Sequence, residues 1–104
     1  MDRADTETAM LTPEQLRAAR ALLGWSRDDL SERVSKSFAK STDQKSGKVS
    51  ANTIKAIELG KTDPKYSTLH KLRRTLEDAG VIFIEPDNAG GHGVRLSKAP
   101  RGKR

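Results

Sequence analysis

Three segments of the chain share one arrangement of hydrophobic and polar positions. In residues 11–16, 25–30 and 49–54, a hydrophobic residue precedes a hydroxyl residue, and a second hydrophobic residue follows four positions after the hydroxyl. A hydroxyl side chain is a preferred N-cap, and the flanking hydrophobic pair forms a staple across the first helical turn. In the first segment, Pro13 suits the first helical position and Gln15 can complete a capping box. The pattern therefore predicts three helices, whose N-caps are Thr12, Ser26 and Ser50.

Apolar residues then recur at intervals of three and four, the spacing that places side chains on one face of a helix. A fourth helix is predicted from near Ser67 to Gly80, through three leucines at the same spacing. The core faces of the resulting small helical bundle are expected to consist of Leu16, Ala19, Leu22, Leu23, Leu30, Val34, Ile54, Ile57, Leu69, Leu72 and Leu76.

The hydrophobic period changes to two after the fourth helix. Residues 81–85 are rich in β-branched and aromatic side chains, and residues 94–97 alternate apolar and polar side chains, so a β-hairpin is predicted. Its first strand has two apolar faces, with Val81 and Phe83 on one and Ile82 and Ile84 on the other. Because the helices can cover only one face, Ile82 and Ile84 are expected to form a partner surface, such as a homodimer contact through the hairpin.

The composition indicates a small single domain. At 104 residues the chain has room for one modest core, and it contains no cysteine for disulfides or zinc–cysteine sites. No apolar run approaches the roughly 20 residues that span a bilayer, and the first ten residues are acidic where a signal peptide would be basic. We therefore expect a cytoplasmic protein with no membrane partner.

The net charge of +6 is unevenly distributed along the chain. Residues 35–48 carry four lysines and one acid, and residues 94–104 carry five bases and no acid, whereas residues 1–11 have a net charge of −2. A basic balance attracts polyanions such as nucleic acids, although solvated loops and tails also explain charge runs. The expected organisation is a disordered segment over 1–11, a helical domain over 12–80, the hairpin over 81–97 and a basic disordered tail over 98–104.

Catalytic, metal and cofactor chemistry have no convincing sequence signal. The glycine-rich residues 90–93 follow no strand-to-helix transition of the P-loop kind and fit a hairpin tip. His70 has no second ligand at the helical spacing, and Trp25 between two helices is interpreted as a structural plug. No nucleophile, base and orienting group stand in a recognisable set. We therefore expect a protein that is not an enzyme and that uses no metal and no cofactor.

The run IKAIELGKTDP, residues 54–64, carries a family resemblance. It predicts a helix that ends at Gly60, with Pro64 four residues on. An almost identical run ends the recognition helix of the phage-repressor-like, or XRE, helix-turn-helix family. This chain resembles that family from about Thr12 to Gly80. The resemblance implies a mainly α fold, a four- to five-helix phage-repressor-like helix-turn-helix bundle, followed here by the C-terminal β-hairpin. It also implies that double-stranded DNA is a partner.

In this family the second helix of the motif lies in the major groove, with residues near its N-terminus reaching base edges. By resemblance that helix is residues 50–59. Asn52 can pair with adenine, Lys55 with guanine or phosphate, and the alanines can touch a thymine methyl group. Two lysines that follow the helix suit phosphate contacts. The implied DNA-binding residues are Arg27, Ser50, Ala51, Asn52, Lys55, Ala56, Lys61 and Lys65.

The chain departs from the family in the turn between the two helices of the motif. This turn usually has three to four residues, whereas here an insertion covers about residues 36–48. The spacing of Leu30, Val34 and Phe38 predicts that the preceding helix continues by a turn, leaving residues 41–48 as a loop. The loop can either embrace DNA or obstruct its docking. The lysines that would make the loop contacts are Lys36, Lys40, Lys45 and Lys48.

Two functions of different classes follow from these features. The first is a DNA-binding transcriptional regulator, such as a repressor, acting as a dimer. The second is a helix-turn-helix scaffold that works by protein binding, such as an antiactivator that sequesters a transcription activator. The family signature and the lysines favour the first, and the enlarged turn, the two alanines at reading positions and the apolar hairpin favour the second. An antitoxin that combines both activities is a third option, with no specific feature in its favour.

Overall fold

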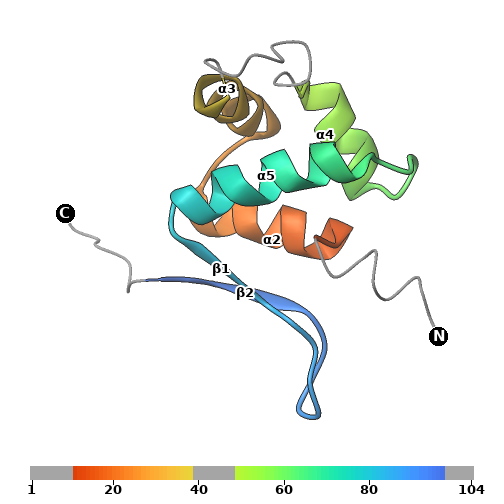
Figure 1. The fold of residues 1–104 in the computed structure, drawn as a ribbon, viewed down its shortest axis with the longest axis vertical. Coiled ribbons are helices and arrows are strands. Elements are labelled where there is room, and N and C mark those ends of the chain that lie inside the picture. The colour runs from red at the N-terminus through yellow and green to blue at the C-terminus, as the bar shows by residue number, and fades with distance from the viewer. Residues whose placement is uncertain (1–10, 39–48, 98–104) are drawn as a thin grey trace.

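The computed structural model describes residues 11–38 and 49–97 of the chain, and residues 1–10, 39–48 and 98–104 lie outside this range. The described part contains four helices followed by one two-stranded antiparallel sheet. The elements are α2 (Pro13–Leu23), α3 (Arg27–Ser37), α4 (Ala51–Glu58), α5 (Tyr66–Asp78), β1 (Val81–Ile84) and β2 (Gly93–Leu96). In Figure 1, α2 and α5 lie in the middle, with α3 and α4 on one side of them and the hairpin on the other.

All three expected N-caps are confirmed. The Thr12 hydroxyl accepts a hydrogen bond from the Gln15 backbone N–H at 3.0 Å, and the Gln15 side chain accepts one from the Thr12 N–H at 3.0 Å. Ser26 and Asp29 form the same reciprocal capping box on α3, and Ser50 caps α4 by accepting from the Thr53 N–H at 3.1 Å. Each cap satisfies backbone donors that the first helical turn leaves unpaired.

The helix ends also follow from local sequence. Gly24 and Gly60 both have a φ of 71°, in the left-handed region that glycine enters without steric cost. They end α2 and α4, and the end of α4 at Gly60 is the one expected from the sequence. The expected extension of the second helix is confirmed, because α3 continues through Lys36 and Ser37 to its C-cap at Phe38. Lys36 and Ser37 therefore belong to α3 and not to the inserted turn.

The core lies where the four helices meet and where the hairpin packs on α2 and α5. Most of the predicted core leucines and isoleucines are buried, but Leu22 is 43% exposed, so its assignment to the core is wrong. Leu22 fits the apolar period of α2, but no described element covers that part of the helix surface. Leu11 lies in the segment 1–11 that the sequence predicts to be disordered, but it is 3% exposed and belongs to the core. The helical domain therefore includes Leu11 as well as the expected residues 12–80.

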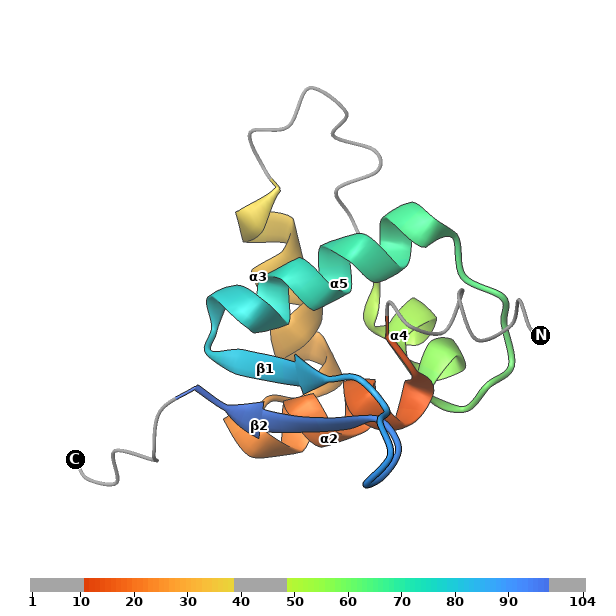
Figure 2. The ribbon, with the colours of Figure 1, turned by 60° about the horizontal axis from the view of Figure 1, so that its bottom comes forward.

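The hairpin packs with one face on the helices (Figure 2). β1 and β2 pair with Val81 opposite Leu96 and Phe83 opposite Val94, which puts these four side chains on the inner face. Val81 and Phe83 are 3% and 8% exposed, whereas Ile82 and Ile84 are 37% and 38% exposed, so the expected division of the strand into two faces is confirmed.

Gln15 joins the hairpin to α2. Its Nε2 donates a hydrogen bond to the Gly93 carbonyl oxygen at 2.9 Å and a longer one to the Ile84 carbonyl oxygen at 3.4 Å. The same side chain therefore caps a helix through its oxygen and holds two strands through its nitrogen.

Several expectations concern residues outside the described range. The N-terminal segment up to residue 10, the loop lysines Lys40, Lys45 and Lys48, and the basic tail over 98–104 all belong to this group. Within the described residues, no helix combines the length and the apolar character needed to cross a bilayer.

Candidate nucleic-acid interface

Helix α4 has one buried face and one exposed face. Ile54 and Ile57 are 0% and 2% exposed and pack into the core, as expected from their spacing. Asn52 and Lys55 are exposed, and the small side chains of Ala51 and Ala56 are half-buried. The residues that the family resemblance assigns to base contacts therefore include two polar side chains that are free to reach a partner.

A buried ion cluster holds α4 against the two preceding helices. Glu58, on the last turn of α4, is 1% exposed. Its Oε2 lies 2.6 Å from Arg20 Nε of α2, and its Oε1 accepts from Arg20 Nη2 at 2.9 Å and from Arg27 Nε of α3 at 3.0 Å. Arg17 of α2 donates to the Glu58 backbone oxygen. Three helices are thus tied at one carboxylate, which orients the exposed face of α4.

The cluster determines the ionisation of Glu58. Burial raises the pKa of the Glu58 carboxyl, but the hydrogen bonds and charges of Arg20 and Arg27 outweigh burial and hold this pKa below its ordinary value near 4.5. The same hydrogen bond with Glu58 raises the pKa of Arg20, against the opposing effect of burial. Glu58 and Arg20 are therefore charged at neutral pH, and the carboxylate of Glu58 lies against the guanidinium groups of Arg20 and Arg27.

The structure assigns additional roles to two of the candidate DNA-binding residues. Arg27 is engaged with Glu58, and its side chain is 35% exposed, so only part of its guanidinium faces solvent. Ser50 caps α4, and its hydroxyl also lies 3.0 Å from that of Thr53. Arg27 therefore helps to orient α3 against α4, and Ser50 stabilises the start of α4, in addition to any contact with DNA.

The other candidate lysines within the described residues lie on the connection from α4 to α5 and on the last turn of α3. Lys61 and Lys65 are exposed on the connection between α4 and α5, and Lys65 is the N-cap residue of α5 without a side-chain capping bond. Lys36 is exposed on the last turn of α3, with its Nζ 4.0 Å from Glu32 Oε2, a distance typical of a weak surface pair. These three ammonium groups are accessible to a polyanion.

Other residues singled out in the sequence have structural surroundings. Trp25 packs partly buried against the core, with the Arg33 guanidinium 4.8 Å from its ring centroid, and its carbonyl accepts from Arg20 Nη1 at 2.9 Å. His70 is exposed and stacks on Tyr66 at a centroid distance of 6.4 Å. In the part of the chain that the structure describes, no three metal-binding side chains gather in one place.

Sequence reasoning missed the ion cluster around Arg20 and Glu58, and it missed the contact of Gln15 with the hairpin. Glu58 follows Ile57 directly on a helix whose apolar residues face the core, which is an unusual place for an acid and the one local signal of a buried ion pair. No local pattern identifies its two arginine partners, because they lie 38 and 31 residues away along the chain.

Comparisons of the chain with protein-family models, with curated proteins and with solved structures gave no match. The features that bear on function are therefore the geometry of the described residues and the resemblance of the helical segment to the helix-turn-helix family.

Proposed function

We propose that this chain is a DNA-binding transcriptional regulator of the phage-repressor-like helix-turn-helix type, which reads operator DNA through α4. The observation that carries the proposal is the division of α4 into a core face locked by Glu58 and a free face with Asn52 and Lys55. A reading helix needs this combination, because base-edge contacts require side chains that are accessible on a rigidly oriented helix.

The side chains of this surface match the chemistry of a DNA duplex. The Asn52 amide can donate to N7 and accept from N6 of adenine, and Lys55 can reach a guanine edge or a phosphate. Lys61 and Lys65, exposed beyond the C-terminal end of α4, would neutralise phosphates and set the register of the helix in the groove. Specificity would then depend mainly on Asn52 and Lys55, since Ala51 and Ala56 offer only methyl groups.

Titration of the labelled chain with a duplex selected in vitro for tight binding, and with an unrelated duplex, tests the proposal. At two salt concentrations, a salt-dependent response centred on Asn52 and Lys55 is expected for the selected duplex. No response at either salt, and no enrichment of any sequence during selection, would reject DNA binding and favour the protein-binding function.

Replacing Lys61 by alanine is expected to weaken binding to both duplexes and to reduce the slope of log K against log salt by about one. The reason is that a phosphate contact contributes counterion release whatever the base sequence. Arg95→Ala is the matched control, because this exposed cation belongs to β2, and β2 lies on the opposite side of α2 and α5 from α4 (Figure 1). A salt slope that is the same for Lys61→Ala and for the native chain would remove Lys61 from the interface.

A second candidate function, protein binding, is favoured by the outer face of the hairpin. Ile82 and Ile84 stay more than one third exposed although both are large and apolar, and they stand two residues apart on the same face of β1. Such a face suits a second copy of the chain, as expected from the sequence, or a different protein such as a transcription activator.

If this face forms a homodimer, the double change Ile82→Lys and Ile84→Lys is expected to give a folded monomer. The two charges would be tolerated at exposed positions but would repel each other across the dimer contact. Sedimentation velocity measures the outcome, with the double change Asn88→Lys and Ala89→Lys at the exposed hairpin tip as a control of equal added charge. A native chain that is monomeric at high concentration would exclude the homodimer.

A further inference from the structure

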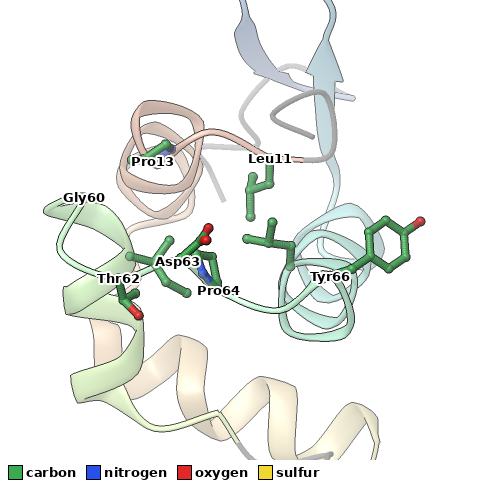
Figure 3. A pocket seen from close by; sticks show the side chains of 9 residues that line it. Leu11, Pro13, Gly60, Thr62, Asp63, Pro64 and Tyr66 are labelled. Atoms are coloured by element: carbon green, nitrogen blue, oxygen red, sulfur yellow. The ribbon is translucent and has the colours of Figure 1, made fainter. Parts of the chain in front are cut away.

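A groove of about 400 Å³ opens between the start of α2, the connection from α4 to α5, and the first turns of α5 (Figure 3). Its walls are mostly apolar and come from three separate segments of the chain. Leu11 and Pro13 come from the start of α2, Ile57 and Pro64 from α4 and the connection that follows it, and Leu69 from α5. Volumes of roughly 300–1,000 Å³ with mainly apolar walls are typical of small-molecule sites.

Asp63 supplies the charge of the groove. Among the lining residues, only Asp63 and Tyr66 have ionisable side chains. Figure 3 shows the Asp63 carboxylate directed into the space between α2 and α5. Within the described residues, Asp63 has no hydrogen bond and no ion pair. The Tyr66 hydroxyl points away from the space, so the ring of Tyr66 contributes an apolar rim.

We propose that this groove is a binding site for a small organic cation with an apolar body, such as an alkyl or arylalkyl amine. The apolar part would lie on Ile57, Pro64 and Leu69, and the ammonium group would pair with the Asp63 carboxylate. An anion is disfavoured, because it would have to approach the negative charge of the exposed Asp63 carboxylate.

The neighbouring charges limit the contribution of the ion pair. Lys61 and Lys65 stand two residues to either side of Asp63 and are exposed, so they weaken the negative potential at the mouth of the groove. Exposed ion pairs contribute about 0.2–1 kcal/mol, which corresponds to an affinity gain of up to about fivefold. Apolar contact would therefore contribute most of the affinity, at up to about fourfold for each methylene group buried.

The site lies beside the proposed DNA interface without depending on it. Residues 60–66 contribute both the groove lining and the two lysines assigned to phosphate contacts, so an occupant would add a positive charge between those lysines. Binding in the groove is measured on the chain without DNA, and its outcome is therefore separate from the outcome of the DNA titration.

The test uses the full ¹⁵N-labelled chain, titrated with primary n-alkylamines from butyl to octyl and with the n-alcohols and n-carboxylates of the same lengths. Saturable shifts are expected at Ile57, Thr62, Asp63 and Leu69. The amines should bind up to about fivefold more tightly than the alcohols, and the carboxylates more weakly than both. Affinity should rise with chain length and then stop rising once the groove is filled.

Two variants separate the charge from the groove. The Asp63→Asn variant should bind alcohols as the native chain does, and it should bind amines no more tightly than alcohols. Asp28→Asn, at an exposed position on α3, is the control and should keep the preference for amines. The proposal is overturned if the shifts spread over the surface without saturation, if carboxylates bind as tightly as amines, or if Asp63→Asn keeps the amine preference.

Discussion

Replacing Glu58 by alanine is expected to lower the free energy of unfolding by about 3–5 kcal/mol, a large part of the stability of a domain of this size. The change would leave the Arg20 guanidinium, whose side chain is 17% exposed, without the carboxylate that matches its charge. The guanidinium of Arg27 would lose the same partner. Urea unfolding followed by circular dichroism measures the effect.

A conservative change and a matched control make this result specific. Glu58→Gln keeps the size and one acceptor, so its loss should be smaller than that of alanine and the variant should stay folded. Glu32→Gln on α3 removes an acid whose side chain is 68% exposed, and it should change stability by no more than about 0.5 kcal/mol. Equal effects of the Glu58 and Glu32 changes would show that the buried cluster does not hold the helices together.

The pH dependence of stability follows from the same cluster. Because the pKa of Glu58 is lower in the folded chain than its ordinary value near 4.5, the ionised carboxylate stabilises the fold above that pH. This contribution is lost as the pH falls from about 4.5 through the folded-state pKa. Glu58→Gln should therefore lose less stability than the native chain between neutral pH and pH 3, as measured by urea unfolding at each pH.

Asn52→Ala is expected to weaken binding to the selected duplex by about 1–3 kcal/mol, or about five- to 150-fold, while binding to unrelated DNA is nearly unchanged. The reason is that a bidentate amide contact discriminates one base from the others, whereas unrelated DNA is held through its phosphates. Asn52 is exposed and has no side-chain hydrogen bond with the other described residues, so its loss should leave stability unaffected.

Fluorescence anisotropy with both duplexes at one salt concentration measures this effect. Asn88→Ala is the matched control, because Asn88 is an exposed asparagine at the hairpin tip. Equal losses on both duplexes for Asn52→Ala would exclude a base-reading role, and no loss on either would remove Asn52 from the interface.

The elements of this chain were predictable because their signals are local. Thr12, Ser26 and Ser50 each satisfy a donor three residues away, and Gly60 ends α4 through its own backbone conformation. The two faces of β1 follow from the alternation of side chains along a strand, which needs no knowledge of the rest of the fold. Interactions within one turn or one strand are encoded in adjacent residues, so the sequence alone determines them.

The tertiary structure decided which of these faces are covered and which distant charges meet. Leu22 has the apolar spacing of a core residue, yet it is exposed, because burial depends on whether another element packs over that part of α2. Glu58 meets Arg20 and Arg27, and Gln15 reaches Gly93, across separations of 31 to 78 residues. The groove likewise exists only where residues 11–13 come to lie against residues 57–69. These contacts depend on how the helices pack in three dimensions, and no pattern within a few residues of the chain specifies that packing.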